Sequence, residues 1–384
     1  MLKAYKYRIY PNKSQKELIN KHIGSTRFLY NLALETKLSA YASNRKYLSL
    51  YDLIKQIPDL KKECMWLKEI NSQSLQMSLR NLDKAFTGFF KGKSNFPKYK
   101  SKWNGSQSFN IPQHIKLENN TVKFPKFNEG IKIVIHRNIK GKIKQGTISR
   151  STTGKFYISI LCETNECIPK KHNITNNTVG IDLGIKDFLI TSNKERIKNP
   201  KYLKKLENKL KYNQRKYSKY KGKRTKKKIS KLHEKIRHQR MNFLHQISSK
   251  LVKENQSIAI ENLDIKGMMQ NGYISKSISD VSWGAFIRML KYKSEWYGKN
   301  LIQIGRFEPS SKTCSVCGNI NKNLELKDRT WSCYKCNTDH DRDVNAAINI
   351  KNFALKKYVS GVDTKNHGEL PTLVRAMTRE NNKL

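Results

Sequence analysis

The segment from Thr178 to Asp187, TVGIDLGIKD, constrains the fold of this chain more than any other. Two sets of residues alternate along it: Val179, Ile181 and Leu183 against Gly180, Asp182 and Gly184. A period of two with apolar residues on one side predicts a buried strand. A carboxylate in such a strand is costly unless a positive charge or a metal ion offsets it. Asp182 is therefore a candidate cation ligand.

Two further carboxylates occupy comparable positions. Residues 257–263, SIAIENL, predict a second buried strand, with Glu261 inside it. Asp343 precedes the helical pattern VNAAINI, where it is well placed as a helix N-cap. An N-cap role alone would also account for Asp343, so the residue is not by itself evidence of a site.

These three carboxylates can meet if the two strands are neighbours in one sheet and the helix packs against that sheet. Mg²⁺ favours a few carboxylate oxygens together with waters and substrate phosphate. Two such ions can activate an attacking water and stabilise the leaving oxygen in phosphodiester cleavage. We therefore expect Asp182, Glu261 and Asp343 to hold Mg²⁺ and to act as catalytic residues in phosphodiester cleavage.

Four cysteines form the most specific local motif. Cys314 and Cys317 make one CxxC pair, and Cys333 and Cys336 make a second after fifteen intervening residues. This spacing predicts a tetrahedral Zn²⁺ site, and four thiolate ligands leave no open position for catalysis. The remaining cysteines follow no disulfide pattern, which fits a reducing compartment such as the cytoplasm: Cys64, Cys162 and Cys167.

The charge of the chain points to a polyanionic partner. Lys and Arg number 77 against 30 Asp and Glu, a formal net charge of +47 spread over most of the length. Nucleic acid over a large footprint fits this surplus. An anionic membrane surface is the alternative, but the N-terminus carries no amphipathic basic helix and no apolar signal-peptide core. No apolar run approaches the roughly 18 residues of a membrane span, so we expect no membrane partner.

Two stretches suit contact with nucleic acid. Leucines at helical spacing in residues 72–90 predict a helical core with a polar outer face, and residues 91–112 mix lysines with aromatic rings. The candidate contacts are polar or basic side chains of these stretches: Gln73, Gln76, Arg80, Lys98, Lys100 and Lys102. A solvated helix face, and a basic loop whose aromatics fill the core, are the respective alternatives.

Other parts of the chain predict a sheet, a strand that can join it, and a pair of helices. Residues 113–166 contain short alternating runs typical of a small antiparallel barrel or sheet, which residues 3–9 can join as a strand. Residues 200–253 predict a long basic helical pair that we interpret as a phosphate-binding arm.

The motifs GIDLGIKD, IAIENL, the paired CxxC knuckles and DRDVNAAINI, in this order, resemble the TnpB family. These are transposon-encoded RNA-guided DNA nucleases related to type V CRISPR effectors and to Fanzor. The FPKYKSK segment and the N-terminal region are also similar, so the resemblance covers nearly the whole chain except its end. In the family the acidic triad falls on positions matching Asp182, Glu261 and Asp343, with Asp341 as a close neighbour.

The resemblance implies a multi-domain α+β architecture, with a split RuvC-like nuclease of RNase H fold. The implied parts are a first wedge strand (1–10), a helical recognition domain (11–112), a wedge β-barrel (113–172), two nuclease segments (173–310) that include the basic helical pair, a zinc ribbon (311–340), a third nuclease segment (341–359) and a flexible tail (360–384).

The resemblance also implies a function. A guide RNA from the transposon end would pair with double-stranded target DNA, and the protein would read a short flanking motif and cut beside it in a Mg²⁺-dependent reaction. We expect a monomer bound to one RNA in a prokaryotic cytoplasm. A nuclease-silent DNA-binding regulator, a transposase and a resolvase-like enzyme are the alternatives.

Overall fold

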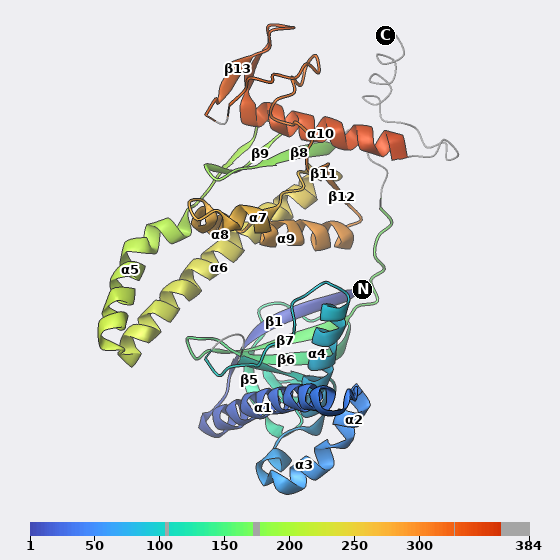
Figure 1. Ribbon diagram of the computed structural model, residues 1–384, viewed down its shortest axis with the longest axis vertical. Helices are drawn as coiled ribbons and strands as arrows, with labels where there is room; N and C mark the ends of the chain where they lie inside the picture. The colour runs from blue at the N-terminus through green and yellow to red at the C-terminus, as the bar shows by residue number, and fades with distance from the viewer. Residues whose placement is uncertain (104–106, 172–176, 326, 362–384) are drawn as a thin grey trace. The chain divides into compact units, whose positions relative to one another are not determined.

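The computed structural model describes residues 1–103, 107–171, 177–325 and 327–361 (Figure 1). Contacts divide the chain into two units, Met1–Cys167 and Ile168–Leu384. Most of the tail expected at 360–384 lies outside the described residues. None of the described helices is both long enough and apolar enough to cross a membrane.

Unit 1 contains the expected helices and strands. Its helices are α1 (Lys13–Asn44), α2 (Leu50–Lys55), α3 (Ile57–Glu63), the 3₁₀ helix Met65–Glu69 and α4 (Ser72–Phe90). A buried core joins α1 to α4 through leucines such as Leu34, Leu75 and Leu79. The leucine spacing thus predicted the core of this helical layer correctly.

Seven antiparallel strands form the sheet of unit 1. They are β1 (Leu2–Tyr10), β2 (Gln107–Ile111), β3 (Lys116–Glu118), β4 (Thr121–Phe124), β5 (Phe127–Val134), β6 (Lys142–Arg150) and β7 (Phe156–Glu163), in the order β2-β6-β7-β1-β5-β4-β3. Because β1 lies between β7 and β5, the helices are inserted between the first strand and the other six.

Two features of this sheet go beyond what the sequence indicated. Strand β2 begins at Gln107, inside the range 11–112 assigned to the helical recognition domain, and its Phe109 and Ile111 are buried in the core of the sheet. Among the described strands, β2 and β3 stand at opposite ends of the pairing order, so their hydrogen bonds form a sheet with two edges and no closed barrel.

Unit 2 is built on a mixed five-stranded sheet. Its strands are β8 (Thr178–Leu183), β9 (Asp187–Thr191), β10 (Arg196–Lys198), β11 (Ser257–Ile260) and β12 (Asn300–Gln303), in the order β10-β9-β8-β11-β12. Strand β11 runs parallel to β8 and to β12, whereas β9 is antiparallel to β8. The two strands that carry or precede the predicted carboxylates, β8 and β11, are therefore direct neighbours.

Helices cover both faces of this sheet (Figure 1). Helix α10 (Arg342–Gly361) lies on one face, and α6 (Lys223–Glu254) and α9 (Trp283–Trp296) lie on the other, while α5 (Tyr202–Tyr220) packs on α6. The unit also contains α7 (Ile265–Gln270) and α8 (Ser275–Val281), and the short strands β13 (Thr330–Ser332) and β14 (Asp339–Asp341) precede α10. The apolar residues of β8 pack with α6 and α9, whereas Ala259 of β11 packs with Ile350 and Ala354 of α10. The predicted basic helical pair is confirmed as α5 and α6.

Gly180 sets the distance between β8 and α10. A Cβ atom at this position would lie 2.0 Å from the carbonyl oxygen of Ala347 and 2.7 Å from the amide nitrogen of Lys351. The helix backbone therefore rests directly on the strand, two residues before Asp182. Glycine is required here because a close backbone approach leaves no room for a side chain.

We predict that Gly180→Ala destabilises unit 2 by about 3 kcal/mol, since the added methyl group must displace α10 from the sheet. Chemical denaturation of the full chain measures the change. Gly272→Ala is the matched control, because nothing lies within 4 Å of a Cβ at that position. Equal stability of the two variants would contradict the close packing of α10 on β8.

Candidate functional site

Asp182 lies on the face of β8 that is turned toward α10. Burial, then the negative charges of Glu261 and Asp343, raises the pKa of Asp182 to about 7, and the positive charge of Arg342 opposes them. Like charges disfavour ionisation of a carboxyl group when they are close to it. The structure therefore brings Glu261 and Asp343 within electrostatic reach of Asp182.

Glu261 follows β11 directly, because the strand ends at Ile260. The expectation that Glu261 lies in the middle of a strand was therefore wrong by one residue. Its side chain is half-buried and accepts a hydrogen bond from Ser310 Oγ at 2.5 Å.

The start of α10 separates the roles of two aspartates. Asp341, not Asp343, is the N-cap: its Oδ1 accepts a hydrogen bond from the amide of Val344 at 3.0 Å. Its Oδ2 pairs with Arg196 Nη2 at 2.5 Å. Asp343 lies in the first helical turn, with Oδ1 3.5 Å from Arg329 Nη1. The N-cap expected at Asp343 is therefore corrected to Asp341.

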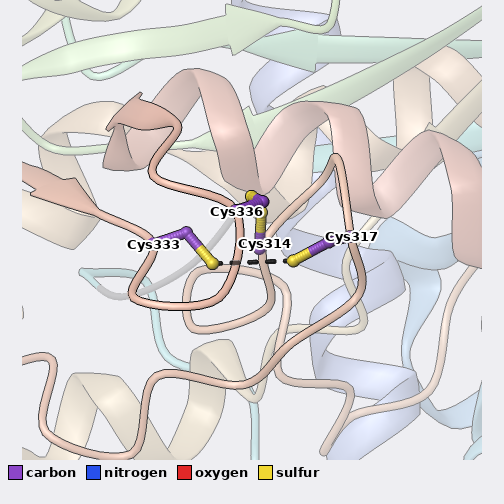
Figure 2. A group of neighbouring side chains, drawn as sticks. All are labelled: Cys314, Cys317, Cys333 and Cys336. Atoms are coloured by element: carbon purple, nitrogen blue, oxygen red, sulfur yellow. Dashed lines mark hydrogen bonds between the residues drawn. The ribbon is translucent and has the colours of Figure 1, made fainter.

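The four predicted zinc cysteines come together (Figure 2). The Sγ atoms of Cys314, Cys317, Cys333 and Cys336 all lie within 4.8 Å of one another. Hydrogen bonding to Thr338 lowers the pKa of Cys336 to about 6, which favours the thiolate that a metal ion needs. Four sulfur donors at this separation fit a tetrahedral Zn²⁺ ion with a structural role.

The three carboxylates are less tightly grouped than the thiols. Within the part of the chain that the structure describes, the four cysteines are the one group of three or more His, Cys, Asp or Glu side chains whose ligand atoms lie close enough to hold a single ion. The carboxylates are instead related electrostatically, because the charges of Glu261 and Asp343 both raise the pKa of Asp182.

Three of the candidate nucleic-acid contacts share one pocket in unit 1. Gln73, Gln76 and Arg80 on α4 line it, and its volume is about 430 Å³. The Oε1 atom of Gln73 is buried, and no hydrogen-bond partner for it is present in the described residues.

The three lysine candidates differ from one another. Lys98 and Lys102 are exposed, and Lys102 Nζ lies 5.4 Å from the ring centre of Trp103. Lys100 Nζ lies 3.8 Å from the ring centre of Tyr30, and its amide donates to Asn31 Oδ1. Lys100 therefore helps to hold its loop against α1, a structural role that the sequence pattern did not indicate.

Sequence reasoning also missed three residues around the carboxylates. Arg196 pairs with Asp341, Ser310 binds Glu261, and Asn349 donates a hydrogen bond to the carbonyl of Ser310. Nothing in their local patterns marks them, since each acts through a residue far away in sequence. The two asparagines within the run VNAAINI of α10, Asn345 and Asn349, were the available signal.

Family models match three parts of the chain. The IS605 OrfB model, described as "Probable transposase", matches residues 159–272, and a "Cas12f1-like, TNB domain" matches residues 283–350. A "Helix-turn-helix domain" matches residues 1–46, where the structure has strand β1 followed by the single long helix α1.

Whole-length relatives agree with these matches. A Streptomyces pristinaespiralis protein named "Putative RNA-guided DNA endonuclease" is 36% identical over 91% of this chain and 88% of its own length. The Escherichia coli K-12 protein "Putative RNA-guided DNA endonuclease InsQ" is 28% identical over 91% of each chain. The chain belongs to the IS605 OrfB family of transposon proteins, which is the TnpB family.

A solved structure also matches most of the chain. The structure titled "Structure of the mini-RNA-guided endonuclease CRISPR-Cas_phi3" covers 92% of both chains with a TM-score of 0.46 and 9% identity. The family assignment rests on the sequence relatives and not on this likeness.

Metal analysis of the purified protein is expected to give about one Zn²⁺ per chain. We predict that Cys317→Ser lowers the zinc content and unfolds the ribbon, because folding of such ribbons depends on the bound ion. Cys167→Ser is the control, since that thiol is exposed and outside the cluster. A folded chain that holds no zinc would refute the site.

Proposed function

We propose that this protein is an RNA-guided, Mg²⁺-dependent DNA endonuclease. The observation that carries the proposal is the set of three carboxylates, in which Glu261 and Asp343 act on the buried Asp182. Mutual repulsion of this kind is relieved by a divalent cation. The relatives named RNA-guided DNA endonucleases support the choice of reaction.

Asp182, Glu261 and Asp343 would hold the Mg²⁺ ions, because hard carboxylate oxygens are the ligands that Mg²⁺ prefers. Bound there, a pair of ions supplies an activated water and charge stabilisation for phosphodiester hydrolysis. A pocket of about 610 Å³ is lined by Ser310, which donates a hydrogen bond to Glu261, and by Arg342, the residue before Asp343. Its lining carries both signs of charge, with Lys312 and Arg342 against Glu308 and Glu325.

The sheet of unit 2 supports a RuvC-like nuclease domain of RNase H fold. Strands β8, β9 and β10 form an antiparallel meander, and β11 and β12 extend it in parallel beside β8. The motif residues Asp182 and Asp343 then come from the central strand and from the helix that covers it. The ribbon of residues 311–340 sits in the chain directly before that helix.

Guide RNA and double-stranded target DNA are the proposed partners. The net charge of +47 suits binding of these two polyanions, and the lysines of α5 and α6 suit their phosphates. Base pairing would select the target, whereas the protein would read a short flanking motif. The pocket of Gln73, Gln76 and Arg80 is the proposed reader, because Gln and Arg can each form bidentate bonds to base edges. We propose a monomer with one RNA, acting in the cytoplasm.

The match to the family model described as "Probable transposase" favours one second candidate, a transposase that joins strands with the same carboxylates. It predicts strand-transfer products, which the cleavage assay below would detect as joined ends. A nuclease-silent regulator predicts binding of target DNA with no cleavage in the same assay.

Substitution of any of the three carboxylates tests the centre. Asp182→Ala, Glu261→Ala and Asp343→Ala are each expected to lower cleavage of a guide-matched duplex by about 10³-fold or more, because the ions lose a ligand. Binding of the co-purified RNA should stay unchanged. Asp59→Asn, an exposed carboxylate on α3, is the control. Full cleavage by Asp182→Ala would refute the proposed centre.

The two neighbouring aspartates should behave differently. Asp341→Asn keeps an oxygen to cap Val344 and loses the charge paired with Arg196, so cleavage should fall by less than about tenfold. Asp343→Asn should abolish it. Arg196→Gln should lower cleavage at least as much as Asp341→Asn, since Arg196 pairs with Asp341 and also with Asp187, at 3.4 Å. The opposite order of the two aspartate variants would make Asp341 the ligand.

A further inference from the structure

A short segment of chain connects the zinc cysteines to the carboxylates. It runs from Ser310 to Ser315 and includes the zinc ligand Cys314. At its first residue, Ser310 Oγ donates a hydrogen bond to Glu261 Oε1 at 2.5 Å. Three residues separate Ser310 from Cys314 of the cysteine cluster, so the ribbon and Glu261 share one piece of backbone.

Two buried amides of α10 hold this segment in place. Asn349 Nδ2 donates to the carbonyls of Ser310, at 2.8 Å, and Thr313, at 2.5 Å. Asn345 Nδ2 donates to Thr313 O at 2.7 Å, and its Oδ1 accepts from the amide of Ser315 at 2.9 Å. The two side chains are 2% and 1% exposed. Buried hydrogen bonds of this kind are costly to break because the partners cannot turn to water.

The same helix carries Asp343, two residues before Asn345. One rigid element therefore sets the position of one carboxylate directly and of a second one through Ser310. Glu261 directly follows the last residue of β11, and the amide of Ile304 donates to the carbonyl of Ile260 at 3.0 Å, which anchors the backbone just before Glu261. The hydroxyl donor at Oε1 restricts the rotation of the carboxylate group in addition.

We propose that Ser310 is a positioning residue that orients the carboxylate of Glu261 toward a divalent cation, and that Asn349 and the zinc ribbon hold Ser310 in place. The inference rests on the proposed function for the identity of the cation site. It assigns the ribbon a second task, which is to set the geometry of the cleavage centre.

The test measures Mn²⁺ binding as well as cleavage. Full-length protein with its co-purified RNA, free of DNA, is titrated with Mn²⁺ and followed by electron paramagnetic resonance. The variants are Ser310→Ala, Ser310→Thr and the matched control Ser311→Ala, which removes a hydroxyl from the next residue. The zinc content of each variant is measured first.

Ser310→Ala should raise the half-saturating Mn²⁺ concentration about tenfold, as expected for loss of one hydrogen bond to a charged group. It should keep its zinc and its RNA. Ser310→Thr retains the hydroxyl and should bind Mn²⁺ within about threefold of the wild type. Ser311→Ala should match the wild type. Equal Mn²⁺ binding by Ser310→Ala and Ser311→Ala overturns the proposal.

Asn349→Ala provides a second arm. It should weaken Mn²⁺ binding in the same direction, and adding Ser310→Ala to it should cause little further loss, because both act through one hydrogen bond to Glu261. Fully additive losses overturn the link between Asn349 and Ser310.

These results separate the inference from the proposed function. If the wild type binds Mn²⁺ but cuts no guide-matched DNA, while Ser310→Ala binds more weakly, the inference stands and the proposed function fails. If the wild type cuts and Ser310→Ala both binds Mn²⁺ and cuts like the control, the inference fails and the proposed function stands.

Discussion

The contact of α10 with β8 is the constraint on which the rest of unit 2 depends. At Gly180 the helix backbone meets the strand with no side chain between them, and a Cβ there would lie 2.0 Å from Ala347 O. This close approach brings the first turn of α10, with Asp343, over the carboxylate of Asp182. It also places Asn345 and Asn349 where they can bind the segment that begins at Ser310. A wider separation would remove all of these relationships together.

That arrangement brings three carboxylates into electrostatic reach of one another in a protein whose net charge is strongly positive. The pKa of Asp182 is raised to about 7 by burial and by the two other carboxylates, although the chain carries a net charge of +47. Long-range attraction from exposed lysines is screened by salt over about 10 Å and does not neutralise a buried group. The basic surface and the acidic centre therefore differ in the charge that they suit: the first suits a polyanion, and the second suits a small cation.

Local periodicity was sufficient to predict the elements that bury apolar side chains. The alternation at Thr178–Leu183 and the leucines of α4 gave correct elements, because burial on one face leaves a repeating pattern. The ligand spacing of the four cysteines was sufficient for their cluster, since one ion demands four nearby thiolates. Periodicity failed where tertiary contacts decide, as at Glu261, which lies just past its strand, and at β2, which an aromatic loop pattern concealed.

The two aspartates of DRD show why the remaining roles could not be read from the sequence. Both Asp341 and Asp343 satisfy the composition of an N-cap, and a shift of two residues around a helix start changes which one points into the site. The choice depends on Arg196, which lies 145 residues away and draws Asp341 toward the edge of the sheet. An ion pair so distant in sequence leaves no local pattern. Both oxygens of Asp341 are engaged, by Val344 and Arg196, whereas Asp343 pairs with Arg329 and raises the pKa of Asp182 through its charge.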